Sequence, residues 1–110
     1  MNQRGRDALR AAGLAGVRQI TGNYSDTAGG RCALGVLADV HRNAIYHDFR
    51  PFGLNVEVEA CHLCGATTIS GNEKFPITAE HQLVAHLNDD HLLDFLGIAE
   101  KMPVTDEPGA

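Results

Sequence analysis

The chain has 110 residues and a net charge of −5, enough for one domain with a modest hydrophobic core and too few for two. No apolar run approaches the roughly 18 residues that cross a membrane, and no signal peptide is recognisable, so we expect neither a membrane protein nor a secreted one. Three cysteines, an odd number, fit a reducing cytoplasm better than a disulfide framework. We therefore predict a cytoplasmic protein.

The first half of the chain predicts two helices joined by a loop. Apolar and glycine residues recur at helical spacing over residues 5–20 and again over residues 31–43. The composition of residues 21–30 is that of a loop. Gly13 and Gly16 weaken the first helix by about 1 kcal/mol each relative to alanine, so we expect them to let another element pack closely.

The middle of the chain predicts a β-hairpin. After a short extended piece over residues 44–53, valine alternates with glutamate over residues 55–61, the pattern of a half-exposed strand. Residues 66–70 are the expected partner strand, which places ACHLCGATTI, residues 60–69, at the hairpin tip. Residues 71–76 then form a turn.

The last third predicts two more helices. The first covers residues 77–87, with Thr78 as its N-cap. Its buried stripe consists of Leu83, Val84 and Leu87. The polar run NDD, residues 88–90, ends this helix, and the last helix covers residues 94–101 with Asp94 as its cap.

Cys61 and Cys64 form a Cys-x2-Cys pair on a turn, which supplies two of the four donors of a tetrahedral zinc site. Gly65 suits that turn because glycine adopts a positive φ without strain. A redox-active pair is the alternative, but such a pair sits at the start of a helix, and here the flanking patterns are those of strands. We predict a structural zinc site. Cys32, the third cysteine, lies in a helical apolar stripe and is expected to be buried.

Three histidines spaced five residues apart offer the remaining ligands. On one regular helix, His81 and His86 diverge by about 140°, whereas the predicted helix break lies between His86 and His91 and lets both rings face one point. We predict His81 to be an exposed helical residue, although His81 or His62 remains an alternative ligand. The predicted zinc ligands are Cys61, Cys64, His86 and His91.

Asn88 and Asp89 lie between the two predicted histidine ligands. Short polar side chains at such a place either hydrogen-bond the backbone of the turn or orient a ligand imidazole. Both interpretations stay open.

CHLCG together with HLNDDHLLDFLGIAEKM, residues 86–102, resembles small uncharacterised zinc-knuckle proteins of actinobacteria and their phages. Their pattern is Cys-Pro-x-Cys-Gly, then His-Leu-Asn-Asp-x-His, a tryptophan two residues on, and a helix carrying Ile-Ala. RCALGVLADV also resembles a segment of related small phage proteins, and together these stretches cover about half of the chain. The matching residues are Cys61, Cys64, Gly65, His86, Leu87, Asn88, Asp89, His91, Ile98 and Ala99. His62 replaces the usual proline and Leu93 the usual tryptophan. The resemblance implies a metal-binding module without assigning it an activity.

These patterns together predict an α+β fold. Residues 1–102 form a small single domain with N-terminal helices, a zinc-knuckle β-hairpin and C-terminal helices, and residues 103–110 form a flexible acidic tail. Four protein ligands leave no position for water or substrate, so the zinc is expected to be structural and the protein not to be an enzyme. We expect a phage-type accessory module that binds another protein.

Two alternatives remain. A nucleic-acid-binding zinc module would use the N-terminal arginines Arg4, Arg6, Arg10 and Arg18, but residues 51–110 carry two lysines against ten acidic residues and would repel phosphates. An HNH-like nuclease would begin its motif at Glu80 and His81 and continue with Asn88 and His91. The interval from His81 to Asn88 is too short for the loop and helix of that motif.

Overall fold

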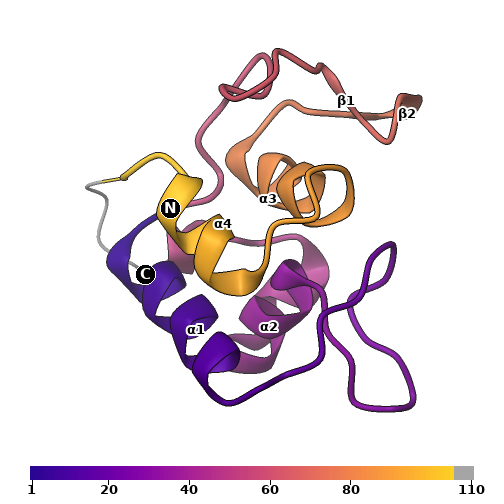
Figure 1. Cartoon of the computed structure of the whole chain (residues 1–110). Helices are drawn as coiled ribbons and strands as arrows, with labels where there is room; N and C mark the ends of the chain where they lie inside the picture. The colour runs from indigo at the N-terminus through magenta and orange to yellow at the C-terminus, as the bar shows by residue number, and fades with distance from the viewer. Residues whose placement is uncertain (106–110) are drawn as a thin grey trace.

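This computed structural model describes residues 1–105 of the chain. This part contains four α-helices and a two-stranded hairpin, joined by loops and two short 3-10 helices (Figure 1). The predicted α+β class, one small domain with helices at both ends and a hairpin between them, is confirmed. The helices are α1 (Gln3–Leu14), α2 (Ala33–Val40), α3 (Glu80–Asp89) and α4 (Phe95–Lys101). The strands are β1 (Thr68–Ile69) and β2 (Asn72–Pro76), and two short 3-10 helices are η1 (Arg42–Tyr46) and η2 (Arg50–Phe52). Within this region, every helix is too short or too polar to cross a membrane.

Helix α1 packs against both α2 and α4 (Figure 1). It begins at Gln3 because the side chain of Asn2 caps it by accepting a hydrogen bond from the Gly5 amide. A Cβ at Gly13 would lie 3.1 Å from Cγ of Leu96 on α4, so this glycine does allow close packing, as predicted. The prediction for Gly16 is wrong. It has φ +73° and no atom near its Cβ position, and the helix has already ended at Leu14.

Helix α2 is shorter at both ends than the predicted helix over residues 31–43, since it begins after Cys32 and ends at Val40. The Cys32 sulfur accepts a hydrogen bond from the Gly35 amide at 3.4 Å and caps the helix. Cys32 is buried, as expected. The predicted extended piece over residues 44–53 is wrong, since η1 and η2 occupy most of it.

The hairpin forms one segment later than predicted. Val56 and Val58 do not belong to a β-strand. In this segment, Glu57 forms an isolated β-bridge to Ala79. Strand β1 pairs instead with β2, and the residues between them, Ser70 and Gly71, both have positive φ, at 54° and 67°. This conformation is the one that favours a two-residue hairpin turn. The Cys-x2-Cys loop therefore precedes the hairpin instead of forming its tip.

The predicted core stripe of α3 is confirmed: Leu83, Val84 and Leu87 are buried. The N-cap is Ala79 rather than Thr78, because the side chain of Gln82 accepts hydrogen bonds from the Ala79 amide and from Thr78. The helix also runs through residues 88–89 and breaks only afterwards.

Asp94 caps α4 by accepting a hydrogen bond from the Gly97 amide, as predicted. Of the predicted tail over residues 103–110, residues 106–110 lie outside the described part of the chain.

Candidate metal centre

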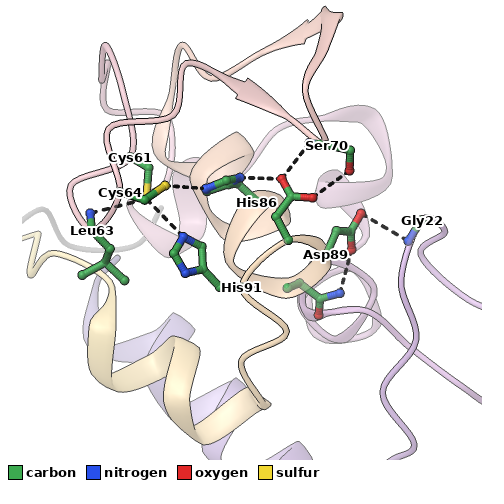
Figure 2. Close-up of polar contacts among 10 residues, drawn as sticks. Gly22, Cys61, Leu63, Cys64, Ser70, His86, Asp89 and His91 are labelled. Carbon is green, nitrogen blue, oxygen red and sulfur yellow. Dashed lines mark hydrogen bonds and ion pairs between the residues drawn. The ribbon is translucent and has the colours of Figure 1, made fainter.

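Two segments bring the four predicted ligands together. Cys61 and Cys64 lie in the loop before β1, His86 lies in the last turn of α3, and His91 lies in the loop that follows. One donor atom from each of the four residues lies within 4.8 Å of all the others. Figure 2 shows both cysteines and both histidine rings pointing toward one another. All three cysteines of the chain are free thiols.

Backbone hydrogen bonds shape the cysteine loop. The Gly65 amide donates to the Cys61 carbonyl at 2.8 Å, and the Cys61 amide donates to the Ala66 carbonyl at 2.8 Å. Gly65 has φ +76°, the positive value expected for the turn, and the Leu63 amide lies 3.4 Å from the Cys61 sulfur. This closed loop holds both sulfur atoms on the side that faces α3.

Cys64 is the exposed thiol of the pair. A hydrogen bond from the Ala66 backbone, followed by contacts with the rings of His86 and His91, lowers the pKa of Cys64 from 9.0 to about 6. The thiolate, which is the form that binds a metal ion, is therefore favoured at neutral pH.

The break at the end of α3 places His86 and His91 on the same side. The His91 amide donates to the His86 carbonyl at 3.3 Å, so the chain stays close to the end of α3 after the helix stops. Leu92, the next residue, has φ +54°, and the chain changes direction there. The two rings lie nearly perpendicular, with centroids 4.9 Å apart. The expectation that a break lets both rings face one point holds, although the break follows Asp89 instead of starting at Asn88.

Two sulfur–nitrogen distances are close to those of a tetrahedral zinc site. Thiolate sulfur at about 2.3 Å and imidazole nitrogen at about 2.0 Å from zinc lie about 3.5 Å from each other in a tetrahedron. Here Sγ of Cys64 lies 3.3 Å from Nε2 of His86, and Sγ of Cys61 lies 3.8 Å from Nε2 of His91. Two thiolates and two imidazoles are also a common donor set of structural zinc.

Asp90 also belongs to this site, although the sequence patterns did not single it out. Its carboxylate accepts from Nδ1 of His86 at 2.6 Å, and from the backbone amide and hydroxyl of Ser70 at 2.6 and 2.8 Å. Partial burial acts to raise the pKa of Asp90, but the hydrogen bonds from Ser70 and His86 outweigh it and leave the pKa below its usual value. The i, i+4 spacing from His86 was the available signal, because residues four apart share a helix face.

Asn88 and Asp89 do not orient a ligand ring. The buried Asn88 side chain accepts from the Ala33 amide at 3.0 Å and donates to the Ile20 carbonyl at 2.9 Å. Asp89 accepts from the Gly22 amide at 3.2 Å (Figure 2). The pair thus holds the end of α3 against the loop between α1 and α2 and against the first residue of α2.

The alternative histidines lie elsewhere. The prediction that His81 is exposed is wrong, because its ring stacks on Phe49 with centroids 4.9 Å apart and is half-buried. Burial lowers its pKa, and its Nδ1 is buried without a hydrogen-bond partner. His62 is exposed, with Nε2 lying 2.7 Å from the Lys101 carbonyl oxygen. Neither histidine belongs to the four-residue cluster.

Comparisons with protein family models, with curated proteins and with solved structures found no match for this chain.

Three residues of the two alternative functions have other surroundings than those functions require. The carboxylate of Glu80 is buried and accepts from the amino group of Met1 at 3.4 Å. Of the N-terminal arginines, Arg6 is buried and Arg18 forms an ion pair with Asp26.

Proposed function

We propose that Cys61, Cys64, His86 and His91 bind one structural zinc ion, and that the domain is a small non-catalytic module that binds another protein. The observation that carries the zinc site is the convergence of four donors from two segments within 4.8 Å. Four protein donors complete a tetrahedron and leave no position for a substrate, which supports a structural role. The assignment to phage-type accessory proteins rests on the sequence resemblance alone.

A bound zinc ion would link the cysteine loop directly to the end of α3 and to the loop that follows it. The cysteine loop is largely exposed, and the hairpin after it consists of two short strands, which are marginal without further support. Binding free energy at such a site is folding free energy, because the unfolded chain holds no preformed site.

Native mass spectrometry of protein purified without chelator tests the zinc site. We expect one zinc ion per chain, lost in His86→Ala and in His91→Ala. His62→Ala is the matched control, since this residue neighbours Cys61 and lies outside the cluster, and it should retain the metal, as should His81→Ala. A metal-free parent protein would overturn the zinc assignment.

The structural role has its own test. Cys64→Ser should unfold the cysteine loop, the hairpin and the end of α3, seen as lost dispersion of their amide signals in NMR spectra. Thermal unfolding of the parent with and without a strong chelator should show the same loss of stability. A Cys64→Ser protein that remains folded and unfolds cooperatively at the parent's temperature would refute a structural zinc.

A further inference from the structure

A groove lies between the hairpin and the loop that follows α1, with one face of α3 as its floor. Its volume is about 400 Å³, within the range of protein binding pockets. Figure 1 shows α3 beside the hairpin, with the loop around residues 20–30 on its other side. The lining residues are Gly22, Tyr24, Ile69, Ser70, Asn72, Phe75, Ala85 and Asp89.

The walls of the groove are apolar and open to solvent. Phe75 on β2 is 56% exposed, although a large apolar side chain gains free energy by burial. Ile69 on β1, Tyr24 on the opposite loop and Ala85 on the floor are half-buried. A ligand with a large apolar side chain would bury the ring of Phe75 against these residues.

The charge of the groove is negative. Asp89 is the one charged residue among those that line it. The floor is also the last turn of α3, where the helix dipole places partial negative charge and favours cations. A basic group therefore complements the groove, and an acidic one would be repelled.

We propose that this groove binds an extended segment of a partner protein that carries a lysine or arginine next to a large apolar side chain. The inference rests on the proposed function as a protein-binding module and names the chemistry of its partner. The basic group pairs with Asp89, and the apolar side chain packs between Phe75 and Tyr24.

The groove is coupled to the metal centre through one wall. Ser70, at the hairpin turn, hydrogen-bonds Asp90, and Asp90 hydrogen-bonds the zinc-ligand candidate His86. Zinc bound to His86 would therefore also hold the hairpin, which forms one wall of the groove, in place beside α3, which forms its floor.

Selection from a phage-displayed library of random linear peptides on the zinc-loaded protein tests the proposal. We expect enriched sequences with a basic residue next to an aromatic or large aliphatic one. A synthetic peptide of the enriched sequence, followed by fluorescence anisotropy, should bind Phe75→Ser and Asp89→Asn at least about tenfold more weakly than the parent, and more weakly as salt increases.

Two variants serve as matched controls. Leu14→Ser replaces an apolar residue that is 83% exposed on α1, and Asp7→Asn removes a carboxylate from the same helix. Both should bind the peptide like the parent. Ala85→Gln fills the floor without changing charge and should also weaken binding, which keeps the test decisive if Asp89→Asn disturbs the loop at Gly22.

No enrichment, enrichment of sequences without a basic residue, or unchanged affinity in both Phe75→Ser and Ala85→Gln would overturn the proposal. The zinc content of the same preparation separates the two claims. A zinc-loaded protein that selects no peptide refutes the groove and leaves the structural zinc intact, whereas a metal-free protein that selects basic, apolar peptides refutes the zinc and leaves the groove.

Discussion

Asp90 accepts a hydrogen bond from Nδ1 of His86 at 2.6 Å, while Nε2 of the same ring lies 3.3 Å from the Cys64 sulfur. A proton held on Nδ1 leaves the lone pair on Nε2, the nitrogen that faces the thiol. Carboxylates that act on ligand histidines in this way fix the tautomer and raise the basicity of the ring.

Asp90→Ala should therefore weaken zinc binding by about 10–100-fold, the usual effect of removing such a partner. Competition with a chromophoric chelator measures it. Ser70→Ala is the control, because it removes a hydroxyl from the same carboxylate and leaves the contact with His86 in place. Equal zinc affinity in Asp90→Ala and the parent would contradict the orienting role.

His81 should make the protein sensitive to acid. Burial lowers its pKa in the folded chain, so the unfolded chain binds the proton more readily. Its contribution to stability is present above its ordinary pKa of 6.5 and is lost as the pH falls toward the lower folded value.

His81→Phe keeps a ring against Phe49 and removes the buried Nδ1 that lacks a partner. We expect its melting temperature to fall less than that of the parent between pH 7 and pH 5.5, measured by circular dichroism. His62→Phe, at an exposed site, should follow the parent. Parallel curves for His81→Phe and the parent would show that His81 does not cause the acid sensitivity.

Asn88→Ala should destabilise the fold by about 3 kcal/mol, since it leaves the Ala33 amide and the Ile20 carbonyl without their partner. Denaturant unfolding of the zinc-loaded protein provides the measurement. Asn43→Ala, on the exposed surface of η1, is expected to change stability by less than about 0.5 kcal/mol. A small effect at Asn88 would mean that other contacts hold α3 to this loop.

Gly35→Ala should be at least as damaging. A Cβ at Gly35 would overlap the Tyr24 carbonyl oxygen, which as a backbone atom cannot rotate away. We expect a loss of about 3 kcal/mol or more in the free energy of unfolding. Gly13→Ala is the comparison, because its Cβ meets only the flexible Leu96 side chain and alanine favours the helix by about 1 kcal/mol. Equal stability of the two variants would contradict the close packing at Tyr24.

Local patterns in the sequence identified the helices and the four residues of the metal cluster. The stripe of Leu83, Val84 and Leu87 and the cap at Asp94 follow from helical spacing and from side chains near in sequence. Cys61 and Cys64 were recognisable because two thiols on one turn need no distant partner to point the same way.

The tertiary structure decided every feature that depends on residues far apart in the chain. The alternation at Val56 and Val58 predicted a strand, but a strand needs a partner, and the turn at Ser70 and Gly71 paired β1 with β2 instead. Asn88 accepts a hydrogen bond from the Ala33 amide, which is more than fifty residues away in the sequence, and no local pattern encodes such a contact. The groove likewise exists only once the hairpin, α3 and the loop at Tyr24 meet, because its walls are contributed by three separate stretches of the chain.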